Sequence, residues 1–543
     1  MNKLFSLLSI LLFVALGYSQ EGTPKDYLSK EFHKQRRDVL RSKMPKNSVV
    51  VVFANPIRNR ANDVDYVFHQ DPNFYYLTGY REPNAVLVLF SDDQANENGN
   101  HNEILYVQER NKRAEMWNGR RLGIEGAKNE LGFANASNAI EFLKSKIDFK
   151  KFDKVFIDGK FKDDYRNSGG SADVYDLVKS FKEKSGYDPN AYLSGIKKYF
   201  YNRIEIASIE DKDALVKLIK QFEGRSPELK TDTFIQNFIN ASDQKLAKDA
   251  QQKISLALQP KTNIDIDFFG AQLSDMREIK TEEELKLLTK AVRISAVGQI
   301  EVMKAMKPHM SETELQGIHE FVYKKYGAEY EGYPSIVGAG NNGCILHYVE
   351  NNKTKVGNNL VLMDLGAEYR GYSADVTRTI PASGKFTPEQ KAIYDIVYKA
   401  QEAGIKATVV GAAFNAPNIA SRAEINKGLL ALGIIKTLTE KHNYLPHGVS
   451  HYLGLDVHDP GVYGKFRANS IITVEPGIYI PEGSPCDKKW WGIAVRIEDD
   501  ILITDKGPIN LSREAPRTSD AIEKMMAKKS VLDAFVLPDL DKK

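Results

Sequence analysis

Short apolar runs alternate with stretches of helical spacing through the first half of the chain. The run NSVVVVFA at residues 47–54 predicts a buried strand, and residues 85–90 and 104–107 predict two more. Between about residues 190 and 260 the composition shifts to Lys, Gln, Asp and Ala with helical spacing, so the charges are expected on a solvated helix face. This half therefore predicts an α/β domain with an extra helix-rich segment.

Helix starts are the clearest signals in the second half. Thr281, Ser311 and Thr387 each stand three residues before a Glu or Gln, which is the spacing of a capping box. Three helices are therefore expected to begin near residues 282, 312 and 388. Strands are predicted at residues 360–364, 373–380, 470–480 and 494–504. Helices packed on a long antiparallel sheet would make the fold class of the chain α+β (mixed α/β).

The N-terminus has the pattern of a secretion signal. Lys3 gives a positive start, residues 4–16 are mostly apolar, and Gly17 and Ser19 are small residues at the −3 and −1 positions of a cut before Gln20. The alternative is a transmembrane anchor, but the run is shorter than the ~20 residues that span the hydrocarbon. We therefore predict cleavage near Ser19, a secreted or periplasmic location and no stable membrane insertion.

Length and charge limit the remaining possibilities. The 543 residues exceed the ~250–300 at which a single core stops growing. A net charge of +3 without a basic stripe argues against a nucleic-acid partner. The two cysteines, Cys344 and Cys486, leave open either two free thiols or one disulfide. The predicted parts are a signal peptide at 1–19, an N-terminal domain at 20–275, a second domain at 276–525 and a tail at 526–543.

Two aspartates flank a predicted hairpin. One strand ends in Asp364, a Gly-containing turn follows, and Asp375 lies on the returning strand. A hairpin centred between Tyr369 and Arg370 would place the two carboxylates directly opposite each other, with Cβ atoms ~5 Å apart. Such carboxylates repel each other unless a cation lies between them, which points to a metal pair. Taken alone, each Asp also has a second interpretation as an ordinary turn or edge residue.

Four of the ten histidines fall between residues 442 and 458. His447 and His451 are four apart in HGVSH, which superficially matches the HExxH pattern of zinc proteases. Gly448 stands where the catalytic Glu would be, and nearby Gly and Pro residues oppose a regular helix, so we reject that interpretation. A loop-and-strand segment that brings several imidazoles to one place is expected instead, because each histidine in a core would need its own buried partner.

Two further acids are expected at the same site. Glu475, before a Pro-Gly bend, and Glu498, in RIEDD, lie on predicted strands whose alternation can direct both side chains to the face of the aspartates. Arg496 lies two residues before Glu498 and shares its side of the strand. It is therefore placed to orient the carboxylate of Glu498.

Several of these strings together match one known family. MDLGAEYRGYSADVTRTIP, HGVSHYLGLDVHDPG, TVEPGIYI and VRIEDDILIT closely resemble the pita-bread metallopeptidases, which include methionine aminopeptidase, prolidase and aminopeptidase P. The likeness is closest to aminopeptidase P, or Xaa-Pro aminopeptidase, and extends through IVGAGNNGCILHY, NFYYLTGYREPNAVLVLF and AEMWNGRRLG. It implies a creatinase-like N-terminal α/β domain followed by a pita-bread catalytic domain. The helix-rich segment near 190–260 and the tail have no counterpart in the pattern.

The resemblance implies five metal ligands at the family's spacing. Asp364 would hold one ion, Asp375 and Glu498 would bridge both, and His451 and Glu475 would complete the other. This oxygen-rich set suits two divalent ions, above all Mn²⁺, with Co²⁺ or Zn²⁺ as alternatives. The implied reaction is hydrolysis of the bond between an N-terminal residue and a following proline, by attack of a metal-bridging hydroxide.

Other residues take implied roles around the ions. Glu475 would also shuttle a proton towards the departing proline nitrogen. His347, His447 and His458 match family histidines that stabilise the charge of the tetrahedral intermediate. Arg496 would orient a ligand carboxylate.

The implied partners are peptide substrates with Pro in second position and further copies of the chain, in a homodimer or homotetramer. Trp117, in EMWNGRRLG, matches a tryptophan that closes a neighbouring active site in the family. The alternative interpretation is that Trp117 is a buried core residue. Within the family, prolidase would take only Xaa-Pro dipeptides, and creatinase works without metal. Some pita-bread proteins are binding modules that have lost the metal site, which the intact set of five ligands argues against.

Overall fold

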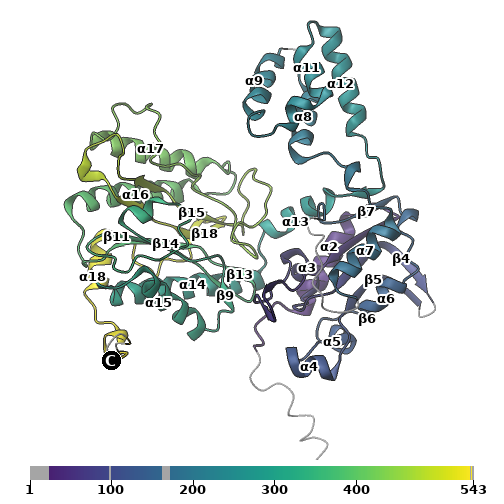
Figure 1. Ribbon diagram of the computed structural model, residues 1–543, viewed down its shortest axis with the longest axis horizontal. Helices are drawn as coiled ribbons and strands as arrows, with labels where there is room; N and C mark the ends of the chain where they lie inside the picture. Colours follow the sequence, from purple (N-terminus) through teal and green to yellow (C-terminus); the bar gives the residue numbers. More distant parts are fainter. Residues whose placement is uncertain (1–23, 97–98, 162–171, 209, 539, 541–543) are drawn as a thin grey trace, which may run out of the picture. The chain divides into compact units, whose positions relative to one another are not determined.

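The chain divides into two compact units. The structure, a computed structural model, describes residues 24–96, 99–161, 172–208, 210–538 and 540 (Figure 1), so the predicted signal peptide lies outside the described residues. One unit is residues 30–272, and the other is residues 273–543 together with the described residues before Lys30. No helix in these described ranges has the length and apolar character needed to cross a membrane.

A six-stranded sheet forms the centre of the first unit. Its strand order is β6-β5-β4-β1-β7-β8, and β1 is antiparallel to β4 and parallel to β7. The strands are β1 (Ser48–Phe53), β4 (Val86–Asn96), β5 (Gly99–Val107), β6 (Ala136–Asn138), β7 (Lys154–Phe156) and β8 (Ile264–Asp265). Val49 and Val51 of β1 are buried with Phe142 of α6 (Ala139–Lys144) and Phe181 of α7 (Val174–Ser185). The three predicted strands of this half are confirmed by β1, β4 and β5.

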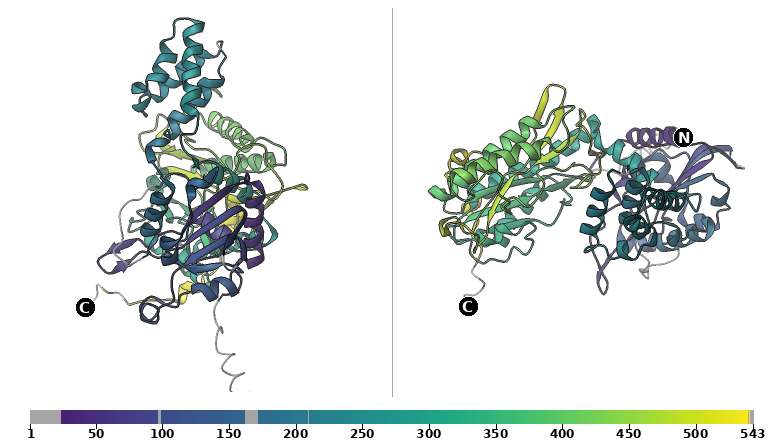
Figure 2. Two further views of the ribbon diagram at one scale, coloured as in Figure 1. Left: turned by 90° about the vertical axis from the view of Figure 1, so that its right-hand side faces the viewer. Right: turned by 90° about the horizontal axis from the view of Figure 1, so that it is seen from above.

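The helix-rich segment folds around a core of its own. It contains α8 (Gly195–Ile206), α9 (Lys212–Phe222), α11 (Thr233–Asn240) and α12 (Gln244–Leu258). Phe200, Ile219, Phe238 and Ile254, one from each helix, are buried together. Figures 1 and 2 show these helices as a bundle, and the prediction of helices here is confirmed.

Trp117 lies on the short helix α4 (Lys112–Asn118), none of whose side chains is buried. Trp117 and Met116 are each 77% exposed. The alternative that Trp117 is a buried core residue is therefore wrong. In the other unit, Cys344 and Cys486 are both free thiols, which decides between the two alternatives for the cysteines.

The helices of the second unit begin where their caps predict. These are α14 (Glu282–Ala305), α15 (Glu312–Lys325) and α16 (Pro388–Ala407), followed by α17 (Ala416–Ala431). Thr281 and Thr387 form reciprocal capping boxes, and the Ser311 hydroxyl accepts the Glu314 N–H. The three predicted helix starts are confirmed.

The strands of this unit do not form the single long sheet that was predicted. Among the described residues they make four small antiparallel sheets, β10-β11-β14, β13-β12-β9, β15-β18-β19 and β16-β17. Their bounds are β9 (Tyr330–Glu331), β10 (Ile336–Ala339), β11 (Leu360–Leu365), β12 (Ala367–Tyr369), β13 (Tyr372–Ser373), β14 (Val376–Pro381), β15 (Ile471–Val474), β16 (Gly477–Ile480), β17 (Ile493–Arg496), β18 (Asp499–Thr504) and β19 (Gly507–Asn510). The sheet breaks where Asp375, Glu475 and Glu498 lie between strands, so these side chains are not tied to a regular pleat.

The hairpin that carries the two aspartates has a different register from the predicted one. Asp364 is opposite Thr377, and Tyr369 is opposite Tyr372, so the turn is centred between Arg370 and Gly371. Both turn residues have positive φ, 53° and 86°, which suits the twist of a two-residue hairpin. The prediction that Asp364 and Asp375 are directly opposite is wrong by two residues, an offset that leaves their side chains on the same face.

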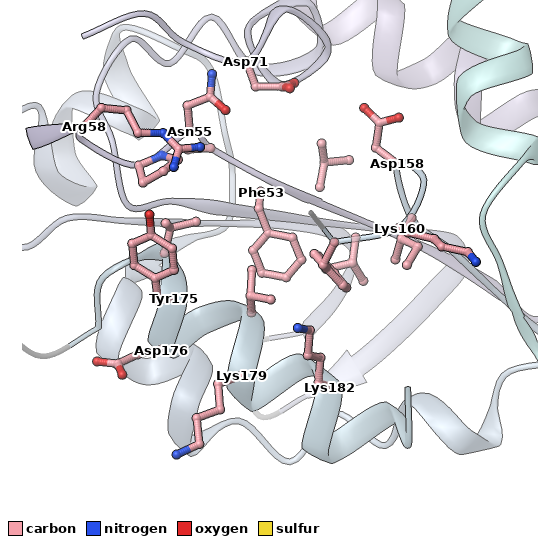
Figure 3. Close-up of a pocket in the computed structure, with 18 residues that line it drawn as sticks. Phe53, Asn55, Arg58, Asp71, Asp158, Lys160, Tyr175, Asp176, Lys179 and Lys182 are labelled. Carbon is pink, nitrogen blue, oxygen red and sulfur yellow. The ribbon is translucent and has the colours of Figure 1, made fainter. Parts of the chain in front are cut away.

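A cavity of about 700 Å³ opens in the first unit, at the carboxyl ends of β1 and β7 (Figure 3). Lys160, Lys182 and Asp158 lie around it, with Phe53 at its centre. No histidine is among the described residues that line it. The predicted chemistry therefore belongs to the second unit.

Candidate metal centre

The predicted ligands converge although they come from four separate segments. Tyr333 Oη donates to Asp364 Oδ1 at 2.5 Å and lies 2.6 Å from Asp375 Oδ1, so one hydroxyl joins the two aspartates. His451 Nε2 lies 3.4 Å from Asp375 Oδ2 and 3.6 Å from Glu475 Oε1. Four of the five residues predicted as ligands are thus linked by short contacts.

Glu498 completes the group. Its backbone N–H donates to the Thr377 carbonyl at 3.1 Å, and its Oε2 accepts the Thr377 hydroxyl at 2.6 Å. Ligand atoms of Asp375, His451 and Glu498 all lie within 4.8 Å of one another, and all three residues are buried. This spacing is compatible with a shared cation.

The helix behind the aspartates fixes the two strands that carry them. Gln299, fully buried on α14, donates from Nε2 to the Met363 carbonyl of β11 at 3.0 Å and to the Val376 carbonyl of β14 at 2.8 Å. The backbone N–H of Asp375 donates to Asp500 Oδ2 at 3.1 Å. The positions of Asp364 and Asp375 are therefore set by contacts from α14 and from β18.

The four carboxylates of the metal centre have too little positive charge around them to ionise together. Burial raises the pKa of Glu498 well above its usual range, and the neighbouring carboxylates of Asp375, Glu475 and Asp364 add to the effect. Burial and the charge of Asp364 also raise the pKa of Asp375. Burial opposes ionisation of Asp364 too, but Arg496 and the Tyr333 hydroxyl outweigh it and lower its pKa.

His451 faces the acids with one nitrogen and the backbone with the other. Nδ1 lies 3.0 Å from the Tyr452 carbonyl oxygen, which fixes Nε2 towards Asp375 and Glu475. Burial alone would lower its pKa, but these two carboxylates raise it to about 9. Its ring stacks on that of His458, with centroids 3.9 Å apart and an interplanar angle of 7°.

Arg496 links the acids to the predicted outer histidines. Its Nη2 donates to Asp364 Oδ2 at 2.5 Å, and its Nη1 donates to the Tyr479 hydroxyl at 2.8 Å. The Tyr479 hydroxyl is in turn 2.8 Å from His447 Nε2. His447 Nδ1 lies 3.5 Å from Glu475 Oε2, so it touches the ligand group directly. The carboxylate that Arg496 hydrogen-bonds is thus Asp364, whereas the strand alternation predicted Glu498.

The three predicted charge stabilisers are less buried than the ligands. His447 is half-buried, and His347 and His458 are exposed, whereas Asp364, Asp375, His451 and Glu498 are buried. Burial lowers the pKa of His447 to about 4, and the charge of Arg496 adds to this effect. His447 is therefore neutral near pH 7 and has one N–H to donate.

Several contributors to the site were not predicted from the sequence, among them Gln299, Asp500 and Tyr479 described above and three further residues. Tyr333 bridges the two aspartates, Thr377 holds Glu498, and Arg422 on α17 donates to the His447 carbonyl at 2.6 Å. Thr377 lies two residues after Asp375 on an extended chain, so strand periodicity would have placed it on the same face. No spacing pattern in the sequence indicates a role for Tyr333 or Arg422.

The donor set fits hard divalent cations. It offers four carboxylates and one imidazole in a space with one guanidinium, and two of the carboxyl groups have raised pKa values. Additional positive charge would allow all four to ionise together. Oxygen-rich sets of this kind select Mg²⁺, Mn²⁺ and similar ions over metals that prefer thiolates.

Comparisons with known proteins agree with this geometry. Residues 286–505 match the model of metallopeptidase family M24, and residues 33–151 match that of the aminopeptidase P N-terminal domain. The chain is 32% identical to the Xaa-Pro aminopeptidase of Escherichia coli over 511 residues, which is 92% of this chain and 98% of that protein. It is 30% identical to the Xaa-Pro aminopeptidase 3 of Rattus norvegicus, over 89% of this chain and 81% of that one.

Solved structures of related proteins share this fold. Aminopeptidase P from E. coli with the inhibitor Pro-Leu superposes with a TM-score of 0.70 at 31% identity, covering 92% of this chain and 98% of the other. The aminopeptidase PepP of Pseudomonas aeruginosa has a TM-score of 0.69 at 28% identity, with the same coverage. The predicted resemblance, the two-domain fold class and the assignment as a hydrolase are confirmed. The chain therefore belongs to metallopeptidase family M24 and carries an aminopeptidase P N-terminal domain.

Proposed function

We propose that this chain is an Xaa-Pro aminopeptidase, which removes one N-terminal residue when proline is second. The observation that carries the proposal is the convergence of four carboxylates and His451 on one buried point of a chain related to Xaa-Pro aminopeptidases over 92% of its length. Relatives with that name support the substrate class, and the donor set supports a metal-dependent hydrolysis.

Asp364, Asp375, His451, Glu475 and Glu498 would hold two divalent ions. When bound, such a pair would supply a water of lowered pKa, able to act as the hydroxide nucleophile near neutral pH, and a Lewis acid for the scissile carbonyl. Mn²⁺ is our choice for the ions because the donors are mostly carboxylate oxygens. One related E. coli structure is a zinc-substituted form, so Zn²⁺ is the alternative to test beside it, together with Co²⁺.

Glu475 is the proposed proton carrier. In the metal-free protein burial raises its pKa to about 7, and a carboxyl group beside the reacting atoms can accept a proton from water and release it to a leaving group. Its Oε1 faces His451 at 3.6 Å and its Oε2 faces His447 at 3.5 Å, so it lies between a proposed ligand and a proposed hydrogen-bond donor. From there it would pass a proton to the departing proline nitrogen.

His347, His447 and His458 would stabilise the negative charge that develops on the scissile carbonyl oxygen. His458 would also restrain the ligand His451, because the two rings stack. Arg496 would orient Asp364 through the 2.5 Å contact described above. We also propose secretion after cleavage near Ser19, on the N-terminal pattern alone.

A peptide digest tests the substrate class. Purified protein loaded with Mn²⁺ is given an Xaa-Pro-Xaa tripeptide, an Xaa-Pro dipeptide and an Ala-Ala-Xaa tripeptide, and products are separated by mass. We expect one residue to be released from the first peptide and much less from the third, because proline has no N–H and a fixed φ that a matching pocket can select. Activity confined to the dipeptide would identify a prolidase instead.

We further propose that Trp117 closes the site of a neighbouring copy in a homodimer or homotetramer. Its 77% exposure leaves the ring available for such a contact. Trp117→Ala should raise KM for longer peptides and weaken the oligomer without changing the metal content. A wild-type protein that is monomeric by light scattering and fully active would contradict this proposal.

A further inference from the structure

A second buried carboxylate lies outside the ligand group. Glu312 is the first residue of α15, and its side chain is fully buried. Within the described part of the chain, no Lys, Arg or His forms an ion pair with it, in contrast to the equally buried Asp499, which pairs with Arg378. Moving a carboxylate out of water without a neighbouring cation costs roughly several kcal/mol, unless hydrogen bonds replace the lost hydration.

Four hydrogen-bond donors replace that hydration, and all belong to one segment. Glu312 Oε1 accepts the Ala339 N–H at 2.7 Å and Asn342 Nδ2 at 3.1 Å. Glu312 Oε2 accepts the Tyr348 hydroxyl at 2.9 Å and the Lys353 N–H at 2.9 Å. Residues 339–353, which we name the 339–353 loop, are therefore gathered around a single carboxylate.

The backbone at the start of α15 closes the same loop. The Glu312 N–H donates to the Lys353 carbonyl at 3.0 Å, and the Thr313 hydroxyl donates to the Asn351 carbonyl at 2.7 Å. Since Ala339 is the last residue of β10, Glu312 joins the two ends of the loop as well as its middle. The loop is thus held at several points by one helix terminus.

The 339–353 loop presents His347 to the metal centre. His347 is exposed, and none of the contacts of Glu312 involves its ring. Leu346 and Tyr348, on either side of His347, pack in one cluster with Tyr479. The Tyr479 hydroxyl lies 2.8 Å from His447 Nε2, so the loop passes beside the histidine that contacts the ligand group. The location of His347 depends on the course of the loop.

We propose that Glu312 is a positioning residue that fixes the 339–353 loop and so delivers His347 to the metal centre. All four partners of its carboxylate are donors, and a carboxylate offers two acceptor oxygens where an amide offers one. Gln in the same place would leave two donors facing its NH₂ group, which also donates. The inference rests on the proposed function, because His347 matters only if this site binds a substrate.

The test compares Glu312→Gln with Glu314→Gln, an exposed acid in the same first turn of α15. Each change is made in the wild type and in His347→Ala. The measurements are kcat/KM on an Xaa-Pro-Xaa peptide, metal content, melting temperature and hydrogen–deuterium exchange across the chain. Exchange reports loop order whether or not the enzyme turns over.

Glu312→Gln should speed exchange within the 339–353 loop, keep its metal and lower kcat/KM by about 10- to 100-fold, the range typical of residues that orient functional groups. In His347→Ala the same substitution should change kcat/KM by less than about 2-fold, because its effect acts through the missing ring. Glu314→Gln should change none of these quantities. Unchanged exchange in a folded Glu312→Gln protein, or an equal loss with and without His347, would overturn the proposal.

A second variant covers the case in which Glu312→Gln does not fold. Tyr348→Phe removes one donor to Glu312 Oε2. It should lower kcat/KM less than Glu312→Gln does, and this effect should again be lost in His347→Ala. Full additivity of Tyr348→Phe and His347→Ala would refute the positioning role. If the wild type fails to cleave any Xaa-Pro peptide, the proposed function is wrong, and the exchange measurement still decides whether Glu312 orders the loop.

Discussion

Two buried acidic clusters of the second unit differ in how their charge is balanced. Asp459 is 1% exposed, and its carboxylate meets Arg277 Nη2 at 2.6 Å and Lys280 Nζ at 2.9 Å. Burial opposes its ionisation, but these two cations outweigh burial and lower its pKa. In the metal centre, burial and neighbouring carboxylates instead raise the pKa of Asp375 and Glu498.

The difference separates a structural network from a functional one. In the Asp459 cluster the chain supplies its own cations, so the cluster is complete when the protein folds. In the metal centre the chain supplies Arg496 and His451 against four carboxylates, so further positive charge must come from outside. Even two adjacent acids differ in this respect. Asp499 forms an ion pair with Arg378 at 2.7 Å, whereas Glu498 has no such partner among the ion pairs of the described residues.

The most damaging change to the metal centre should be His451→Ala. It removes the imidazole among the five proposed ligands and a positive charge between Asp375 and Glu475. We expect fewer than two ions per chain by elemental analysis and a loss of kcat larger than about 10³-fold, because one ion keeps too few donors. Two retained ions with a normal rate would contradict the assignment.

Arg277→Met tests the balanced cluster. It leaves Asp459 buried with one cation instead of two, and breaking a buried pair in this way costs about 3–5 kcal/mol of the free energy of unfolding. Urea denaturation measures the loss. The matched control is Arg293→Met, whose partner Glu514 is 39% exposed, and which should cost at most about 1 kcal/mol. Equal effects of the two substitutions would show that burial does not govern these pairs.

His447→Ala and His458→Ala should separate charge stabilisers from ligands. Each removes a proposed donor to the developing oxyanion, which costs typically ~10²- to 10³-fold in kcat. Both variants should keep two ions, because neither ring belongs to the proposed ligand set. Loss of metal from His447→Ala would move that residue into the ligand group, and melting curves exclude unfolding as the cause.

The pH dependence of stability in the metal-free protein tests the charge imbalance without any substitution. Glu475 has a pKa raised to about 7, so the folded state binds its proton where the unfolded state has released it, and stability falls as pH rises from about 4.5 to 7. His451, raised to about 9, stabilises below pH about 6.5 and loses that contribution towards pH 9.

Each full proton of difference changes the free energy of unfolding by roughly 1.4 kcal/mol per pH unit. Denaturation of chelator-treated protein between pH 5 and pH 8 measures the slope, and Glu475→Gln should make it shallower below pH 7. Saturating Mn²⁺ should flatten it, because bound cations keep the carboxylates ionised. Stability that rises with pH in the metal-free protein would contradict the charge imbalance.

Local signals predicted much of this fold. The helix starts at Glu282, Glu312 and Pro388 follow from capping residues a few positions away, and three of the six strands of the N-terminal sheet, β1, β4 and β5, follow from short apolar runs. The register of the aspartate hairpin did not follow. Its turn needs positive φ at Arg370, which is held by its backbone N–H to Glu329 at 2.8 Å and by its Nε to Asp26 at 2.8 Å, partners distant in sequence.

The metal centre also combines residues that the sequence predicted with contacts that it did not. The sequence by itself determined which acids and histidines are the candidates, because their types and spacing are read directly and match a known family. Only the tertiary structure decided that Tyr333 joins Asp364 to Asp375 and that Glu312 gathers the 339–353 loop. These partners are brought together by packing between elements remote along the chain, and a hydrogen bond between remote residues leaves no periodicity or spacing in the sequence.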